Sequence, residues 1–209
     1  MHATRQKHQN LALFDFDGTL CRQDSFSRFF FEVLTKREIL LRGIKLLPWL
    51  VAYIVHAYPA AKMRPRVFCA LLQHHNAAKI QEQAHRYAQH LLSQLNPQLL
   101  QQLHAHQARG DRVVLVSASL NLYLAPFCQA LNIELLCTEV EIQDHTLTGH
   151  YASPDCSGPE KQARVLANYC LSDYAKIYAY GNSAEDHELL SLAHYPFMCG
   201  QDHTLPNLR

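Results

Sequence analysis

The sequence predicts an α/β protein in which a parallel sheet core carries an inserted, all-helical cap. Short apolar runs alternate with helical segments through the second half of the chain, a pattern typical of parallel sheets covered by helices. A long block without a convincing strand separates the first apolar run from the others. We therefore predict a core made of residues 1–23 and 97–209, and a helical cap made of residues 24–96.

Composition and charge limit the classes of protein. Of the 209 residues, 48% are hydrophobic and 18% are charged, so the chain can bury a core and is not disordered. A formal net charge of +1 disfavours a nucleic-acid-binding protein. Seven cysteines without a CxxC pair favour reduced thiols in a cytoplasmic protein over a disulfide framework or a zinc ribbon. The polar first ten residues do not resemble a secretory signal.

The first half of the chain predicts one strand followed by helices. Residues 11–16 form an apolar run that ends in acids and glycine, which indicates a buried strand running into a loop. Between residues 25 and 103, Leu, Ala, Gln, Arg and His recur at helical spacing. Prolines are expected to break this stretch at Pro48, Pro59, Pro65 and Pro97.

The second half predicts alternating strands and helices. Strands are expected over residues 112–117, 133–137, 176–180 and 195–199. Helices are expected over residues 121–131, 159–170 and 184–193. Residues 139–151 alternate around a polar Gln-Asp-His turn, which predicts a small β-hairpin.

Reactive side chains follow the ends of the predicted strands or begin the helices next to them. They are Asp15, Asp17, Ser117, Lys161, Asn182 and Asp186. In a parallel sheet, ligands bind at the carboxyl ends of the strands. Paired carboxylates supply a nucleophile and a proton donor, hard oxygen ligands suit Mg²⁺, and a hydroxyl and an ammonium bind phosphate oxygens. The set predicts a phosphoryl-transfer site.

These residues resemble the motifs of the haloacid dehalogenase superfamily of phosphohydrolases. The resemblance is to the branch (subclass IB) that includes phosphoserine phosphatase and several lipid-phosphate phosphatases, among them phosphatidylglycerophosphatase-type members. Its DxDGT motif is matched in full from Asp15 to Thr19, and its apolar strand ending in Ser or Thr is matched by VVLVS with Ser117. Its Lys is matched in CSGPEK, and its GDxxxD motif reads GNSAED here. The matches run in order from residue 11 to about residue 195.

The resemblance implies a Rossmann-like core, a cap over the site, and a role for each matched residue. Asp15 would attack phosphorus and form an aspartyl-phosphate, and Asp17 would protonate the leaving oxygen and then activate water. Ser117 and Lys161 would bind phosphate. The residues implied at a Mg²⁺ ion are Asp15, Asp17 through its main-chain carbonyl, Asn182, and Asp186 in support of the metal shell. Asn182 stands where the family usually has an acid, so weaker metal affinity is expected.

Each of these residues also has an ordinary structural explanation. An Asp-x-Asp-Gly segment after a strand can be a turn with solvated carboxylates. Ser117 could cap a helix, Lys161 could be a solvated helix residue, and Asp186 could be a first-turn acid that favours the helix dipole. The four-part match in chain order favours the functional explanation.

The predicted cap contains an unusual apolar and basic segment. Residues 39–55 are apolar except for two cations, and from Lys36 to Arg66 seven Lys and Arg face one acid, a balance of 7 − 1 = +6. With 17 residues, two charges and Pro48, this segment is too short and too polar to span a membrane. Two interpretations stay open: an interfacial helix on an anionic membrane, and a buried helical hairpin of the cap.

The leading functional interpretation is a Mg²⁺-dependent phosphomonoesterase that acts through an aspartyl-phosphate on a lipid phosphate such as phosphatidylglycerophosphate. Peripheral contact with an anionic membrane goes with it. One alternative is the same chemistry on a small soluble metabolite such as phosphoserine. Another is a non-catalytic phosphate- or membrane-binding module that lost turnover through Asn182, against which the presence of both Asp15 and Asp17 argues. No nucleic-acid partner is expected.

Overall fold

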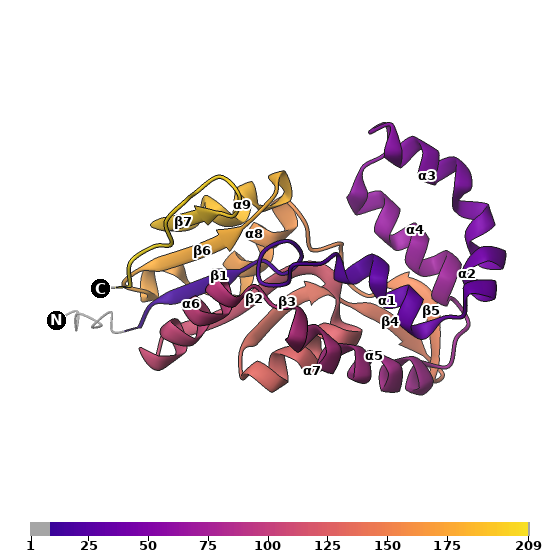
Figure 1. Ribbon diagram of the computed structural model, residues 1–209, viewed down its shortest axis with the longest axis horizontal. Helices are drawn as coiled ribbons and strands as arrows, with labels where there is room; N and C mark the ends of the chain where they lie inside the picture. Colours follow the sequence, from indigo (N-terminus) through magenta and orange to yellow (C-terminus); the bar gives the residue numbers. More distant parts are fainter. Residues whose placement is uncertain (1–8, 209) are drawn as a thin grey trace.

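A parallel sheet forms the centre of the structure, a computed structural model that describes residues 9–208 (Figure 1). Within this range, five strands lie in the order β3-β2-β1-β6-β7, and all neighbouring pairs run parallel. The strands are β1 (Leu11–Phe14), β2 (Arg112–Leu120), β3 (Glu134–Thr138), β6 (Ile177–Gly181) and β7 (Tyr195–Met198). The predicted α/β fold with a Rossmann-like parallel sheet is confirmed; the expectation for the polar residues 1–8 lies outside the described residues.

Strand β1 is the central strand, and its sequence explains why. Its four residues, LALF, are all buried, as expected for a strand covered on both faces of a parallel sheet. It pairs with β2 on one side and β6 on the other, with Phe14 opposite Leu115 and Tyr180. The carboxyl ends of β1, β2 and β6 therefore meet at one edge of the sheet, where the segments that follow them come together.

Helices cover both faces of the sheet. On one face, α6 (Pro97–Ala108) and α7 (Asn121–Leu131) pack in the same apolar cluster as the even-numbered residues of β1. On the other face, α8 (Pro159–Asn168) and α9 (His187–Leu190) pack with Leu11 and Leu13. Side chains alternate between the two faces along a strand, so β1 contributes to both clusters and ties them together.

Five α-helices lie between β1 and α6 in the described chain. They are α1 (Ser25–Val33), α2 (Lys36–Gly43), α3 (Leu47–Ile54), α4 (Ala60–Leu72) and α5 (Ala77–Leu91). Figure 1 shows α2, α3 and α4 projecting from the body of the molecule, whereas α5 lies beside α7. Phe29 of α1 packs against Tyr87 of α5 and Tyr123 of α7, with ring centroids 5.6 and 4.9 Å apart. The helices α1 and α5 thus pack on α7, which belongs to the predicted core. The boundaries of the predicted cap, residues 24–96, therefore stay a proposal.

The predicted hairpin is present and lies against the helical block. It consists of β4 (Val140–Gln143) and β5 (Thr146–Tyr151), which pair antiparallel. Asp144 and His145 turn the chain with φ of +48° and +62°, the left-handed conformation of tight hairpin turns. The backbones of His74 and Leu147 hydrogen-bond, which joins the α4–α5 connection to β5.

Two elements differ from the sequence-based expectation. Pro65 lies inside α4 and does not break it. A proline removes one helical hydrogen bond, and here the buried side chains of Phe68, Leu71 and Leu72 hold the rest of the helix in place. The helix expected over residues 184–193 is shorter, because a 3₁₀ turn (η4, Ala184–Asp186) precedes α9 and its Asp186 bonds back to the preceding loop.

The apolar segment 39–55 is exposed, so its interpretation as buried core is wrong. None of the residues of α2, the 3₁₀ turn Ile44–Leu46 (η1) and α3 is buried. Large apolar side chains instead face solvent at Leu40, Ile44, Leu47, Val51 and Ile54, with exposed fractions from 53% to 71%. Among residues 9–208, no helix combines the length and the apolar character that a bilayer crossing requires.

A buried hydrogen-bond network around His106 of α6 predicts that the free energy of unfolding depends on pH. His106 is fully buried, and its ring nitrogens hydrogen-bond Asp111 at 2.8 Å and the Tyr180 hydroxyl at 2.9 Å. Burial lowers the pKa of His106 in spite of Asp111. The unfolded chain therefore takes up the proton first, so the free energy of unfolding should fall as pH drops below the unfolded value of about 6.5 towards the lower folded value.

We expect His106→Gln to lower the free energy of unfolding at neutral pH by about 1–3 kcal/mol, because Asp111 loses a buried partner. The variant should also flatten the loss of stability on acidification. Urea denaturation at several pH values measures both effects. The matched control is His104→Gln, on the exposed face of the same helix. If the free energy of unfolding depended on pH in the same way for wild type and His106→Gln, His106 would not be the source of the pH dependence.

Candidate active site

Asp15 lies directly after β1 at the centre of the sheet edge. Its backbone N–H donates to the carbonyl of Tyr180 at 2.9 Å, which extends the β1–β6 pairing by one residue. The residue is 5% exposed. One carboxylate oxygen accepts from Lys161 Nζ at 2.5 Å and the other from the Thr19 hydroxyl at 2.8 Å. Burial raises the pKa of Asp15, and Lys161 opposes that shift.

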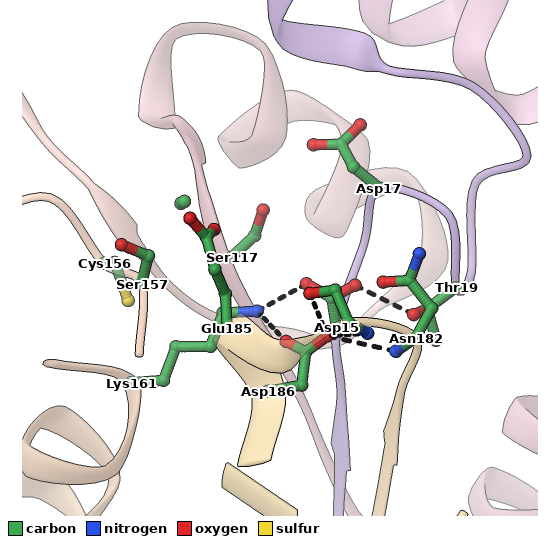
Figure 2. A network of polar contacts seen from close by, with 12 residues as sticks. Asp15, Asp17, Thr19, Ser117, Cys156, Ser157, Lys161, Asn182, Glu185 and Asp186 are labelled. Carbon is green, nitrogen blue, oxygen red and sulfur yellow. Dashed lines mark hydrogen bonds and ion pairs between the residues drawn. The ribbon is translucent and has the colours of Figure 1, made fainter. Parts of the chain in front are cut away.

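Lys161 links two buried carboxylates (Figure 2). It is the third residue of α8, it is 2% exposed, and its Nζ lies 2.5 Å from an oxygen of Asp15 and 2.5 Å from an oxygen of Asp186. Burial opposes the charge of Lys161, but the two carboxylates outweigh burial and raise its pKa. One cation thus stands between two anions, and the lysine is not the solvated helix residue that composition alone would suggest.

Asp186 holds the loop after β6. Its second oxygen accepts from the backbone N–H groups of Asn182 and Ser183 and from the Ser183 hydroxyl, each at 3.0 Å. Burial favours a higher pKa for Asp186, but Lys161 and these donors outweigh it, and the pKa lies below its usual value. Asp186 therefore has both a structural and a site contact, because its side chain caps the 3₁₀ turn η4 and also binds Lys161. Gly181 is required here, because a Cβ on it would lie 2.6 Å from that of Asp186.

Asp17 lines the same cavity as Asp15 but has its own partners. Its carboxylate accepts from the Ser119 hydroxyl at 2.5 Å and from the backbone N–H of Ser25 at 2.6 Å. Burial raises the pKa of Asp17 to about 6, against the lowering effect of these donors. Figure 2 shows Asp17 apart from the Lys161 network. The two carboxylates are therefore held in different environments, which allows them to have different roles.

Ser117 faces the cavity from β2 and is 1% exposed. Its hydroxyl oxygen accepts from the backbone N–H of Ser119 at 3.1 Å, and it caps no helix, because α7 begins four residues later. Ser119 itself was missed by the sequence analysis. The strand was expected to end at residue 117, whereas β2 continues to Leu120 with a shift of register after Ser117, so no local pattern marked Ser119.

Asn182 packs against the DxDGT turn. A Cβ on Gly18, whose φ is +78°, would lie 2.0 Å from Asn182 Nδ2. Only glycine therefore fits this position, and its absent side chain lets the Asn182 carboxamide lie beside the turn. Among residues 9–208, none hydrogen-bonds to that carboxamide, so its oxygen is free to meet a ligand.

These donors suit a hard cation. A carboxylate of Asp15, the main-chain carbonyl of Asp17 and the carboxamide oxygen of Asn182 are all oxygen ligands, as Mg²⁺ prefers, and Mg²⁺ needs few protein ligands because it retains water. Residues 9–208 contain no group of three or more His, Cys, Asp or Glu side chains arranged to hold a metal. A site built on these oxygens and water does not need one, so the residues present fit Mg²⁺.

A cavity of about 330 Å³ connects these residues, within the size range of small-ligand sites. Its polar floor consists of Asp15, Asp17, Ser117, Ser119, Lys161 and Asn182. Its walls include Leu50 and Tyr53 of α3 together with Met63 and Arg64 of α4. The helices α3 and α4 thus cover the cavity, and we call their lining residues its roof. The floor of the cavity lies at the carboxyl edge of the sheet.

Arg64 joins α4 to two loops of the core, those that contain Asp155 and Glu185. Its guanidinium makes a bidentate contact with Asp155, with two bonds of 2.8 Å, and lies 3.2 Å from Glu185. The Arg64 side chain is only 15% exposed. No local pattern predicts these contacts, because the partners lie 91 and 121 residues further along the chain.

Comparison with known proteins gives one family. The model of haloacid dehalogenase-like hydrolases matches residues 12–191. Protein CicA of two Caulobacter vibrioides strains is 30% identical over 186 residues, which cover 88% of this chain and 82% of CicA.

Solved structures share the fold. A protein of unknown function from Bordetella pertussis Tohama I is 26% identical, with a TM-score of 0.74 over 91% of this chain and 89% of that one. A phosphoserine phosphatase solved as a phospho-aspartyl intermediate analogue is 16% identical, with a TM-score of 0.62 over 92% and 87% of the two chains.

Proposed function

The chain belongs to the haloacid dehalogenase-like hydrolase family, and we propose that it hydrolyses a phosphate monoester through an aspartyl-phosphate formed on Asp15. Membership makes the protein a hydrolase, and the phosphatases among its structural neighbours support a phosphatase. The observation that carries the proposal is a buried Asp15 at the central strand end, held by Lys161 and Thr19 at the floor of a cavity.

In the first step, a carboxylate oxygen of Asp15 attacks phosphorus, and the bond from phosphorus to the ester oxygen breaks. Hydrogen bonds from Lys161 and Thr19 hold this carboxylate in one orientation, which lowers the entropic cost of reaching the reacting geometry. The expelled oxygen takes a proton from Asp17. Burial raises the pKa of Asp17 to about 6, which suits a group that exchanges protons near neutral pH.

In the second step, Asp17 takes a proton from water, which attacks the phosphorus of the aspartyl-phosphate and releases inorganic phosphate. Ser119 and the backbone of Ser25 position the Asp17 carboxylate for both proton transfers. Ser117 and Lys161 offer a hydroxyl and an ammonium to the phosphate oxygens. Mg²⁺, held by Asp15, the Asp17 carbonyl and Asn182, would neutralise phosphate charge when bound, with Asp186 in support.

The proposed substrate is a lipid phosphate such as phosphatidylglycerophosphate, and peripheral contact with an anionic membrane goes with it. The support is the apolar roof, since Leu50, Tyr53 and Met63 line the cavity above the acidic floor. The second candidate is a small soluble ester such as phosphoserine. The observation that favours this candidate is that Arg64 lines the cavity: its Nε and Nη2 bind Asp155 and Glu185, which leaves Nη1 to donate to a substrate carboxylate.

The experiment is inorganic phosphate release with Mg²⁺ from phosphatidylglycerophosphate, phosphatidate, lysophosphatidate, phosphoserine and p-nitrophenyl phosphate. We expect the highest kcat/KM on a lipid. The highest value on phosphoserine would keep the catalytic roles and overturn the lipid substrate. No release from any of these esters would contradict the phosphatase and favour the non-catalytic module.

Asn182→Asp should lower the Mg²⁺ concentration that gives half-maximal activity. An added negative charge attracts a cation a few Å away by at least ~1 kcal/mol even in water, which corresponds to about fivefold in concentration. The measurement is activity against Mg²⁺ concentration. Asn168→Asp, which adds the same charge on the exposed end of α8, is the matched control. An unchanged or higher Mg²⁺ requirement would remove Asn182 from the metal shell.

A further inference from the structure

A second cavity, of about 480 Å³, lies in the projecting helical block and shares no lining residue with the catalytic cavity. We call it the basic groove. Its charged side chains are Arg42, Lys45 and Arg66, and no acidic residue lines it. Leu46 and Trp49 add apolar and aromatic surface. A groove with three cations and no acid suits an anion that carries an apolar body.

Among residues 9–208, Arg42, Lys45 and Arg66 form no ion pair, and Glu38, one turn before Arg42 on α2, interacts with Arg42 only at longer range. Arg42 donates to the carbonyls of Leu71 and Gln73. The Arg66 guanidinium stacks on Trp49, 3.9 Å from the ring centroid, and donates Nε to a tyrosine hydroxyl. Lys45 is exposed and has no partner among residues 9–208. Neutral groups therefore position Arg42 and Arg66, Lys45 stays exposed, and the attraction of the three charges for an anion is retained.

An exposed row of large apolar side chains borders the groove on α2, η1 and α3. This apolar ridge consists of Leu40, Ile44, Leu47, Val51 and Ile54. A helix that is apolar on all sides is normally buried, yet α3, LPWLVAYI, buries none of its residues. Soluble proteins rarely leave a contiguous apolar surface of this kind uncovered.

We infer that the apolar ridge and the basic groove together dock on an anionic phospholipid bilayer, with the phosphate of a bilayer lipid in the groove. Charge complementarity selects this partner, because the segment from Lys36 to Arg66 has one acid and seven cations, of which Arg64 is paired with Asp155 and Glu185, and anionic lipids attract cations. Aromatic side chains such as Trp49 favour the boundary between headgroups and acyl chains. The lipid in the groove is an anchor and not the substrate, which binds at Asp15.

The position of α3 connects the docking surface to the catalytic cavity. This part of the inference rests on the proposed lipid-phosphate function. The helix lines the basic groove through Trp49, next to its N-cap Leu46, and it lines the catalytic cavity through Leu50 and Tyr53. A bilayer that holds one side of α3 therefore brings the catalytic cavity to the lipid surface. A phosphorylated headgroup could then enter that cavity while its acyl chains stay in the bilayer.

The test is co-sedimentation of the full chain with vesicles of equimolar phosphatidylcholine and phosphatidylglycerol, compared with vesicles of phosphatidylcholine alone, at low salt. Binding is expected only to the anionic vesicles, and added salt should weaken it. Lys45→Gln should weaken it about fivefold, the loss expected for one cation at an anionic surface. Ile54→Asn should weaken it at least as much. The matched controls, Lys79→Gln on α5 and Leu166→Asn on α8, alter exposed positions elsewhere and should bind as wild type does.

Equal binding to both vesicles, no binding, or equal losses in the controls would overturn the docking inference. A dimer in sedimentation velocity that Ile54→Asn abolishes would show that a second copy covers the ridge, which would also overturn it. Turnover of p-nitrophenyl phosphate tests the proposed function separately, and Lys45→Gln and Ile54→Asn should leave it unchanged. Docking without any phosphatase activity would defeat the function alone, whereas activity without docking would defeat only the inference.

Discussion

Replacing Asp15 with asparagine is expected to abolish phosphate release while the protein stays folded. The carboxamide keeps the size and shape of the carboxylate, but its neutral oxygen is a poor nucleophile toward phosphorus. Removal of a nucleophile that acts with neighbouring groups lowers turnover by far more than removal of a binding contact. We therefore expect kcat to fall by more than about 1,000-fold. Steady-state phosphate release on the best ester of the panel measures this loss.

The control for this variant is Asp144→Asn in the β4–β5 turn. It makes the same chemical change at a residue with φ of +48°, a conformation that asparagine tolerates, and it should keep full activity. Circular dichroism and urea denaturation confirm that both variants fold. Activity of Asp15→Asn within tenfold of wild type would contradict covalent catalysis at this residue.

Removing the positive charge of Lys161 is expected to cost both stability and activity. Lys161 lies 2.5 Å from carboxylate oxygens of Asp15 and Asp186, and all three side chains are nearly buried. In Lys161→Met the two carboxylates lose their shared cation, and breaking such a buried pair costs about 3–5 kcal/mol of unfolding free energy. Loss of a donor to the phosphate should also lower kcat by about 100-fold or more.

A charge-matched double variant separates these two effects. Lys161→Met with Asp186→Asn removes one anion together with the cation, so part of the lost stability should return while activity stays low. Lys79→Met on the exposed face of α5 controls for the substitution itself. Urea denaturation and phosphate release are the measurements. Wild-type stability of Lys161→Met, or recovery of activity in the double variant, would contradict the account of this contact.

The sheet and most of the site could be predicted because their signals are local. A continuous apolar run such as LALF indicates a strand buried on both faces, and residues that follow such strands must meet at the carboxyl edge of a parallel sheet. Asp15, Ser117 and Asn182 meet there in the structure, as their positions after β1, on β2 and after β6 require. The roles of these residues stay predictions until variants are measured.

The remaining features depend on contacts that no local pattern encodes. Ser119 reaches Asp17 across 102 residues of chain, and Arg64 reaches Asp155 across 91. Hydropathy also does not distinguish an apolar helix that is buried from one that is exposed, which is why segment 39–55 allowed two interpretations. A proline predicts a break in a helix, yet the packing of later residues decides the outcome, as Pro65 within α4 shows.

Trapping the covalent intermediate distinguishes hydrolysis through an aspartyl-phosphate on Asp15 from direct hydrolysis by water. The purified enzyme is mixed with its best ester and Mg²⁺, quenched in acid within one turnover, and treated with borohydride, which reduces an acyl phosphate of aspartate to homoserine. We expect homoserine at position 15 by peptide mass spectrometry, only after exposure to substrate and not in Asp15→Asn. A phosphoryl group on another residue, or turnover without any modification at position 15, would contradict this expectation.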